Sequence, residues 1–408
     1  MRRYTWLKRV GEAKRRGLPG LLLVLLLVLT SSTPPTNKIP ASLKWSERMA
    51  LSIKKNNPEP WMIEFSQKPV WSYPQGLVLH AMEKIWRQNP KQNQHYLDYI
   101  KAYADLLIDG KGNIKTYDVY TFNLDMMNAG KILFNLYEQT KDEKYKTALV
   151  TLRNQLEWQP RTTQGGYWHK LRYPWQMWLD GAYMSAPFLA QYGKTFHDPK
   201  AFDVVASQLI LLEKHTRDAR TGLLYHGWDE SKLQPWANPQ TGTSPNFWGR
   251  AIGWYAMALV DVLDFFPQEH PRRNDILQIL QRLAPALQKY QDPETGLWYQ
   301  VVDQGKREGN YLEASASSMF VYALAKGVNK GYLDKNFRKV AEKGHKGLVD
   351  HLIQVKPDGE VNLTQVCAVA GLSADRDGSY EYYVKEKIRT DDPKGTGPFI
   401  LASLELNK

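Results

Sequence analysis

Apolar positions repeat with helical spacing along most of the chain. In one segment after another, apolar side chains recur at i, i+3, i+4 and i+7, which is the period of one face of an α-helix. The segment 247–266 is the clearest, because Ile252, Ala256 and Leu259 fall on one stripe. Alternation typical of strands is limited to short stretches such as 297–301 and 380–384. The pattern therefore predicts an all-α protein.

Twelve helices are predicted from this pattern. Their expected ranges are 43–54, 76–88, 94–108, 124–139, 142–157, 178–193, 199–214, 247–266, 272–290, 313–328, 334–352 and 397–406. Short links such as 89–93, 140–141 and 267–271 join helices in pairs. The segments before the second, fourth, sixth, eighth and tenth helices are instead long and rich in aromatic and polar residues.

Six antiparallel pairs with their long loops at one end describe an (α/α)6 barrel, a ring of six helical hairpins. The N-termini of the inner helices would then face a common cleft, and their free N–H groups would favour an anionic ligand. The alternative is an α-solenoid of helical pairs. A solenoid of this kind shows a steady repeat of about 34–47 residues, which this sequence lacks.

The N-terminus has the layout of a secretory signal. Residues 1–16 carry seven basic groups and one acidic group, and 21–29 are continuously apolar. We expect a signal peptide over 1–32, a linker over 33–42 and a single barrel domain over 43–408. The protein is then exported, either to the periplasm or out of the cell. Nine apolar residues are too few to span about 30 Å of hydrocarbon, although a longer uncleaved anchor stays open.

The amino-acid composition limits the classes of binding partner that we expect for this protein. The chain has 408 residues and a formal charge of +12, of which six units belong to residues 1–32. The other basic residues are interspersed with acidic ones, so we expect neither a nucleic-acid partner nor stable membrane insertion once the signal is removed. The single cysteine, Cys367, excludes an internal disulfide and a thiolate metal cluster, and we interpret it as a small buried residue.

The long loops combine aromatic residues with carboxylates, His and Arg. The C–H face of a sugar packs on aromatic rings while polar groups bind its hydroxyls, so this composition favours a carbohydrate site. Core packing is the alternative for any single Trp. As a group, however, these residues fall where loops meet helix starts: Trp168, Trp175, Trp178, Trp228, Trp236, Trp248 and Trp254.

Two carboxylates in these loops are candidate catalytic groups. Asp180 and Asp125 both lie at expected helix starts, where an N-cap stabilises a helix by about 0.5–2 kcal/mol. Aromatic neighbours, in contrast, desolvate a carboxyl group, raise its pKa and make it a usable acid. Both interpretations stay open at this point. Weaker candidates, which we expect to be solvated or capping, are Asp118, Asp229, Glu230 and Glu313.

His169, His226 and Arg250 are the other polar candidates. A lone His more often forms a hydrogen bond or packs than binds a metal, and no H-x-x-x-H spacing indicates a metal site. Arg250 lies between Trp248 and Trp254 at an expected helix start, where it could bind a carboxylate in bidentate fashion. The alternative for Arg250 is a surface ion pair.

Several of these segments resemble a known family. FNLDMMNAG (122–130), HKLRYPWQMWLDGAYMSAPFLAQYG (169–193), HGWDES (226–231) and FWGRAIGWYAMALVDVLDFFP (247–267) are similar to segments of the unsaturated rhamnogalacturonyl hydrolases of glycoside hydrolase family 105. The unsaturated glucuronyl hydrolases of family 88 are relatives. The resemblance extends in order over about residues 43–405.

The resemblance implies an (α/α)6 barrel that acts, without metal or cofactor, on acidic oligosaccharides released by polysaccharide lyases. The sugar removed is a 4,5-unsaturated uronic acid, expected to be unsaturated galacturonic acid from rhamnogalacturonan. By position, Asp180 resembles the general acid/base and Asp125 the assisting carboxylate. Arg250 is the expected partner of the uronate carboxylate. The residues that resemble substrate-lining positions are His169, Trp178, His226, Trp248, Arg250 and Trp254.

The mechanism implied by the resemblance is hydration of a vinyl ether. Asp180 would protonate C4, and a water molecule activated by the same carboxylate would add at C5. Two alternatives remain: a conventional two-carboxylate glycosidase on the same barrel, and a non-catalytic sugar-binding helical module. The segments 226–247 and 354–396 are expected to shape the subsites for the leaving sugar.

Overall fold

The computed structural model describes residues 38–407, which belong to one compact unit. The expected signal peptide over 1–32 lies outside the described residues, as do positions 33–37 of the linker, so export stays a prediction. Among the described residues, no helix is long and apolar enough to cross a membrane.

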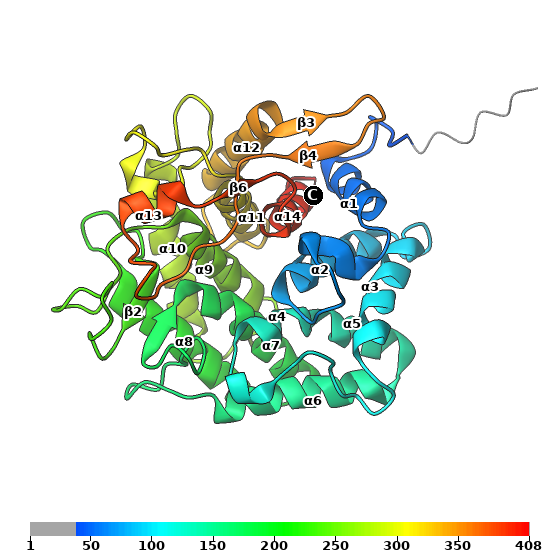
Figure 1. Ribbon diagram of the computed structural model, residues 1–408, viewed down its shortest axis with the longest axis horizontal. Coiled ribbons are helices and arrows are strands. Elements are labelled where there is room, and N and C mark those ends of the chain that lie inside the picture. The colour runs from blue at the N-terminus through cyan, green and yellow to red at the C-terminus, as the bar shows by residue number, and fades with distance from the viewer. Residues whose placement is uncertain (1–37, 408) are drawn as a thin grey trace, which may run out of the picture. The chain divides into compact units, whose positions relative to one another are not determined.

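The inner ring consists of helices that are almost completely buried (Figure 1). In order, they are α2 (Tyr73–Gln88), α4 (Asp125–Ala129) continued by α5 (Lys131–Thr140), α7 (Leu179–Phe196), α9 (Gly249–Val262), α11 (Ala314–Asn329) and α14 (Pro393–Leu406). Each contacts the next, and α14 contacts α2, which closes the ring.

The outer helices pack against the inner ring. They are α1 (Trp45–Asn56), α3 (Gln94–Leu107), α6 (Glu143–Trp158), α8 (Lys200–Thr216), α10 (Arg273–Lys289) and α12 (Phe337–Gly347). Each packs on the inner helix that precedes it, and α1 packs on α14. Helix α10 shows why the outer helices pack in this way. One of its faces is a buried apolar stripe formed by Ile276, Leu280, Leu283 and Leu287, whereas its other face is polar. The predicted all-α (α/α)6 barrel is confirmed.

Two local predictions were wrong. The single helix expected over 124–139 is interrupted at Gly130, which separates α4 from α5. The strand-like stretch at 380–384 is helix α13 (Tyr380–Lys385), which Ser379 caps by accepting a hydrogen bond from the N–H of Tyr382. Its two buried residues, Tyr380 and Tyr383, are three positions apart, so this short pattern fits a helical period as well as alternation.

The strands are short and antiparallel. β1 (Gln176–Trp178) pairs with β2 (Gly227–Asp229), β3 (Ile353–Val355) with β4 (Val361–Leu363), and β5 (Val366–Cys367) with β6 (Ile388–Arg389). The stretch at 297–301 forms only isolated bridges, to Leu312 and Trp248. Short helical turns complete the loops: η1 (Pro60–Phe65), η2 (Val119–Thr121), η3 (Val302–Gln304) and the π-helical turn η4 (Leu348–Leu352).

The β3–β4 hairpin connects the two ends of the ring. The N–H of Val361 donates to Oγ of Ser52 on α1 at 2.9 Å, and Nη2 of Arg48 donates to the carbonyl of Gly359 at 3.3 Å. Asp391, just before α14, accepts at Oδ1 from the N–H of Leu363 at 2.8 Å. The hairpin therefore contacts the first helix and the approach to the last one, next to the place where α1 packs on α14.

Candidate active site

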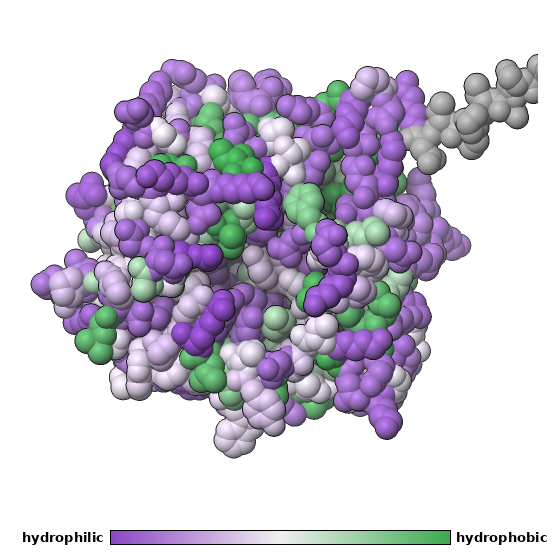
Figure 2. All heavy atoms as spheres, viewed as in Figure 1, coloured by the Kyte–Doolittle hydropathy of each residue, from purple (hydrophilic) through white to green (hydrophobic). Residues whose placement is uncertain are grey.

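A cavity of about 320 Å³ lies at the N-terminal ends of the inner helices. Four of these helices contribute a residue from their first turn to its wall: Tyr73 from α2, Asp125 from α4, Asp180 from α7 and Lys394 from α14. Figure 2 shows the face of the molecule in the same view as Figure 1, hollowed near its centre and surrounded by hydrophilic side chains.

Asp125 is held as a charged carboxylate. It begins α4, and its Oδ2 lies 2.5 Å from Nζ of Lys170 while its Oδ1 lies 3.3 Å from Nε2 of His169. Burial raises the pKa of Asp125, but the charge of Lys170 and the contact with His169 outweigh burial and hold the pKa well below its ordinary value. Asp125 is therefore ionised at neutral pH.

Asp180 has a different environment. Trp178 occupies the N-cap position of α7, and Asp180 is the second residue of the helix, so its side chain is not the cap. Its Oδ2 lies 3.2 Å from Nε2 of His226, but the geometry is not that of a hydrogen bond, since among the described residues neither atom has a hydrogen-bond partner. The carboxyl group, whose side chain is 15% exposed, is thus available to a ligand in the cavity.

His226 lies behind Asp180 rather than on the cavity wall. It is completely buried, and its Nδ1 is 2.8 Å from the hydroxyl of Tyr383. Its ring packs on Trp248, with centroids 4.7 Å apart. The Tyr383 contact fixes the orientation of the imidazole, which places Nε2 toward Asp180.

An aromatic stack forms the wall beside Asp180. The ring of Trp178 is stacked on His169 and on Tyr173, with both pairs of centroids 4.6 Å apart. All three residues line the cavity. Gly181 permits this arrangement, because a Cβ at that position would lie 3.0 Å from Nδ1 of His169. The glycine that follows Asp180 therefore allows His169 to approach α7 closely.

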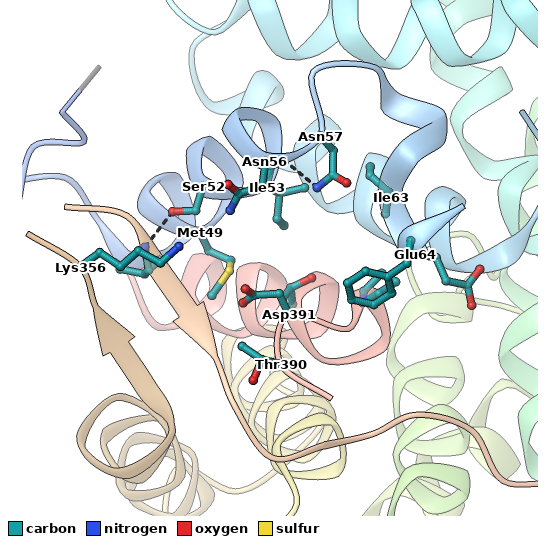
Figure 3. A pocket seen from close by; sticks show the side chains of 14 residues that line it. Met49, Ser52, Ile53, Asn56, Asn57, Ile63, Glu64, Lys356, Thr390 and Asp391 are labelled. Atoms are coloured by element: carbon teal, nitrogen blue, oxygen red, sulfur yellow. Dashed lines mark hydrogen bonds between the residues drawn. The ribbon is translucent and has the colours of Figure 1, made fainter. Parts of the chain in front are cut away.

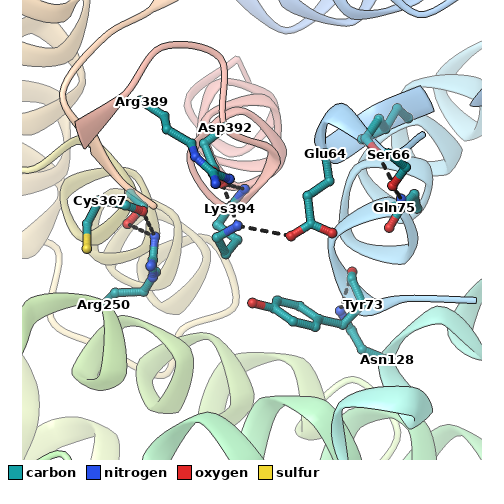
Figure 4. A network of polar contacts seen from close by, with 12 residues as sticks. Glu64, Ser66, Tyr73, Gln75, Asn128, Arg250, Cys367, Arg389, Asp392 and Lys394 are labelled. Atoms are coloured by element: carbon teal, nitrogen blue, oxygen red, sulfur yellow. Dashed lines mark hydrogen bonds and ion pairs between the residues drawn. The ribbon is translucent and has the colours of Figure 1, made fainter. Parts of the chain in front are cut away.

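Three predicted residues are buried away from the cavity wall. Arg250 is 1% exposed, and its Nη1 donates to the carbonyl of Cys367 at 2.5 Å (Figure 4). Its guanidinium lies over the ring of Trp248, 4.9 Å from the centroid. Trp254 packs edge-on against Tyr73 at 6.2 Å. The structure therefore places Trp248, Arg250 and Trp254 in the layer behind the cavity, as it does His226.

A charged network forms the opposite wall (Figure 4), and three of its four residues lie in the segment 354–396 that we expected to shape subsites. Nζ of Lys394 lies 2.8 Å from Oδ1 of Asp392 and 3.4 Å from Oε1 of Glu64. Nη1 of Arg389 lies 3.4 Å from Oδ2 of Asp392. Burial raises the pKa of Glu64, although Lys394 opposes the shift. Glu64, Arg389 and Lys394 all line the cavity.

Tyr73 is a further cavity residue that the sequence did not single out. Burial, together with the nearby carboxylates of Asp125 and Glu64, raises the pKa of Tyr73 well above its ordinary value. The group therefore stays a protonated hydroxyl that can donate a hydrogen bond. Its loop, 70–76, carried the general signal of aromatic and polar residues before an inner helix, but nothing in the loop distinguished Tyr73 from Trp71.

The cavity is cationic overall. Three acidic side chains line it, Glu64, Asp125 and Asp180. Five basic side chains line it as well: Lys170, Arg172, Arg376, Arg389 and Lys394. Within residues 38–407, neither Arg172 nor Arg376 forms an ion pair, whereas the other three are paired with carboxylates. Two guanidinium groups are thus free to bind an anionic ligand.

A second cavity of about 300 Å³ lies on the other side of Glu64 (Figure 3). It is bounded by Met49 and Ile53 of α1 and by Asp391, and Glu64 lines both cavities. Burial raises the pKa of Asp391 to about 6. This cavity is located at the closure of the ring and contains neither Asp125 nor Asp180.

The weaker acidic candidates have structural partners. Asp118 and Glu313 are the N-caps of η2 and α11. Asp229 accepts hydrogen bonds from three backbone N–H groups of its own loop, and Glu230 accepts from Thr163. None of the four lines the cavity that contains Asp180.

Two carboxylates in different environments, an aromatic wall and unpaired cations on an (α/α)6 barrel are the features of an enzyme that acts on acidic carbohydrates. The model of Glycosyl Hydrolase Family 88 matches residues 45–408. The chain belongs to this family and is a glycosidase.

Individual relatives agree with this assignment. Unsaturated rhamnogalacturonyl hydrolase YesR of Bacillus subtilis is 27% identical over 305 residues, which cover 73% of this chain and 80% of YesR. A protein of Agrobacterium fabrum is 37% identical over 230 residues, or 54% of this chain and 97% of the relative. The structure of a family 105 glycoside hydrolase from C. acetobutylicum ATCC 824 matches with a TM-score of 0.85 and 46% identity, covering 90% of this chain and 99% of that one. The resemblance to family 105 and its relatives in family 88 is thereby confirmed.

Proposed function

We propose that the protein removes a 4,5-unsaturated uronic acid from the non-reducing end of oligosaccharides produced by polysaccharide lyases. Family membership supports an unsaturated uronyl hydrolase. The observation that carries the proposal is Asp180, whose Oδ2 has no hydrogen-bond donor within residues 38–407 and whose side chain lines a cavity with two unpaired arginines. We infer unsaturated galacturonic acid from rhamnogalacturonan as the substrate, a choice supported by the similarity to YesR.

In the proposed reaction, the carboxyl group of Asp180 donates its proton to C4 of the vinyl ether, and positive charge develops at C5. A water molecule adds its oxygen to C5 and returns a proton to the Asp180 carboxylate, which gives a hemiketal. The hemiketal opens by breaking the bond between C5 and the ring oxygen. The hemiacetal left at C1 then collapses and releases the remaining saccharide as an alcohol. Asp180 thus serves first as general acid and then as general base.

The other cavity residues have supporting roles in this proposal. Asp125, kept ionised by Lys170, stabilises the positive charge that develops on the sugar ring. The stack of Tyr173 and Trp178 packs on the apolar face of the sugar. Arg172 and Arg376 bind the uronate carboxylate, a role for which Arg250 is less suitable because its guanidinium is engaged with the Cys367 carbonyl.

The test is the loss of the ultraviolet absorbance of the C4=C5 double bond. A lyase digest of rhamnogalacturonan is incubated with the protein, and we expect the absorbance to decay. The Asp180→Asn variant should lose at least about 10³-fold in rate, since it cannot donate the proton. Asp350→Asn, which changes an exposed carboxylate that does not line the cavity, is the matched control. Near-normal turnover by a folded Asp180→Asn variant would remove Asp180 from this role.

One observation favours a second candidate function. Asp125 and Asp180 line the same cavity, as the paired carboxylates of a conventional glycosidase would. Such an enzyme cleaves saturated glycosides as well as unsaturated ones. Product analysis distinguishes the two candidate functions. It compares a lyase digest with oligosaccharides prepared by acid hydrolysis, which lack the double bond. Cleavage of the saturated set at a similar rate would replace vinyl-ether hydration by direct displacement.

A further inference from the structure

Two further cavities continue outward from the rim of the active-site cavity. The first, of about 530 Å³, is lined by Lys170 and Arg172, which also line the active-site cavity. The second, of about 550 Å³, shares Asp118 and Tyr120 with the first and ends at Trp158. The shared residues join the three cavities in series. We call the two outer cavities, from Lys170 to Trp158, the lateral groove.

Two aromatic side chains in the lateral groove are almost fully exposed. Tyr120 is 80% exposed and Trp158 is 77% exposed, so neither contributes appreciably to the core. Side chains able to form hydrogen bonds with hydroxyl groups surround them, among them Thr121, Asn123 and Asn154. Flat apolar rings beside amide and hydroxyl groups match a sugar, which has an apolar C–H face and a polar edge.

The segment that carries Tyr120 is held in a specific conformation. Oδ1 of Asp118 accepts from the N–H of Tyr120 at 3.0 Å, and Phe122 follows with φ of 43°, in the left-handed region. The carbonyl of Thr121 accepts from the N–H of Leu171 at 3.1 Å, which ties this segment to the loop that carries Lys170. A left-handed backbone at a residue other than glycine, as at Phe122 two positions after Tyr120, persists only where neighbouring contacts impose it.

We propose that the lateral groove binds the distal part of the leaving saccharide, that is, the sugars beyond the one bonded directly to the uronic acid that is removed. Tyr120 and Trp158 would be successive stacking platforms for these sugars. This inference rests on the proposed function, because it assigns a longer oligosaccharide to the same site. The occupant is a saccharide rather than a protein, because the groove shares Lys170 and Arg172 with the cavity in which we propose that the terminal sugar reacts.

The experiment compares lyase products of increasing length. The kcat/KM of Tyr120→Ala and Trp158→Ala is measured on unsaturated disaccharide, tetrasaccharide and hexasaccharide, with Leu106→Ala as a control for an exposed apolar residue outside the groove. We expect both variants to match the unmodified protein on the disaccharide. On the longer substrates, kcat/KM should fall about 3–10-fold per variant, mainly through KM, because each ring supplies one stacking contact. Two results would contradict the proposal. In the first, kcat/KM of the variants equals that of the unmodified protein at every substrate length; in the second, kcat/KM falls by the same factor at every length.

Binding separates this inference from the proposed function. Titration calorimetry with the Asp180→Asn variant should show affinity that rises with oligosaccharide length, and adding Tyr120→Ala should remove that rise. If binding depends on length but the unmodified protein shows no turnover, the proposal for the lateral groove stands and the proposed reaction is rejected. If turnover depends on length and neither Tyr120→Ala nor Trp158→Ala alters that dependence, the proposed reaction stands and the proposal for the lateral groove is rejected.

Discussion

Asp125 and Asp180 have identical side chains, and the difference between them comes from the residues that surround each carboxyl group. Asp125 has Lys170 and His169 within 3.3 Å of its oxygens, whereas Oδ2 of Asp180 faces only a buried imidazole. A carboxylate beside a fixed cation is held in its charged form, whereas Asp180 has no lysine or arginine partner among the described residues. The division of roles that we propose therefore follows from the position of a single lysine.

Replacing that lysine should change the pH dependence of catalysis. In Lys170→Met, burial still raises the pKa of Asp125 but the cation that opposes burial is gone, so the pKa of Asp125 rises. The ionised form of Asp125 is then lost at a higher pH, and we expect the acidic limb of the kcat/KM profile to move to higher pH. Lys170→Arg keeps the charge and should leave the limb near its original position. An acidic limb that is the same in both variants would show that Lys170 does not control Asp125.

At the scale of elements, the site depends on how closely two inner helices approach. α2 carries Tyr73, α4 carries Asp125, and the helices meet where Gly76 faces Ala129. A Cβ on Gly76 would lie 2.4 Å from Cα of Ala129, a distance at which the backbone has to move. A glycine on α2 thus sets the separation of two cavity residues.

Gly76→Ala should accordingly destabilise the barrel and impair the site. We expect the free energy of unfolding to fall by about 1–3 kcal/mol, since overpacking a buried contact has this cost. The measurement is urea-induced unfolding followed by circular dichroism, with activity measured in parallel. Gly110→Ala is the matched control, because a Cβ at that position meets nothing within 4 Å. Equal stability of the two variants would mean that α2 and α4 can separate without cost.

At the scale of the whole molecule, closure of the ring depends on a half-buried carboxyl group, that of Asp391. Asp391 forms two hydrogen bonds with the backbone of Leu363 in the β3–β4 hairpin. The Asp391 side chain accepts from the N–H of Leu363, and the N–H of Asp391 donates to the carbonyl of Leu363. Burial raises its pKa from 3.8 to about 6. Because the folded state binds this proton more tightly than the unfolded chain does, Asp391 favours folding below about pH 4. That contribution is lost as the pH rises through about 6.

Asp391→Asn should remove this dependence. The amide keeps an oxygen that can accept from Leu363 but cannot ionise, so we expect the variant to match the unmodified protein near pH 4. Near pH 8 the variant should be more stable by about 1–3 kcal/mol, as a shift of about two pKa units implies. Urea unfolding at both pH values measures the difference, and Asp350→Asn, at an exposed position, should show no such change. A variant that is less stable near pH 8 would contradict this account.

The sequence determined the helices, their pairing and the loops that contain the site. Helical periodicity and alternating link lengths predicted the ring, because each amphipathic helix has to bury one stripe. The same loops contain Asp125, His169, Trp178 and Asp180, which the structure brings to one cavity. These residues lie at or beside the starts of inner helices, and such starts necessarily meet at one end of the barrel.

Only the tertiary structure decided which polar residues face that cavity. His226, Trp248, Arg250 and Trp254 come from equally suitable loops but lie behind the wall, since orientation at a helix start depends on neighbouring packing. Glu64 and Arg376 reach the cavity from distant segments through loop conformations that no local pattern encodes. The free or paired state of each charge is likewise a property of contacts across the ring. The sequence thus determined the scaffold and the chemical groups available, and long-range packing determined which of them can meet a substrate.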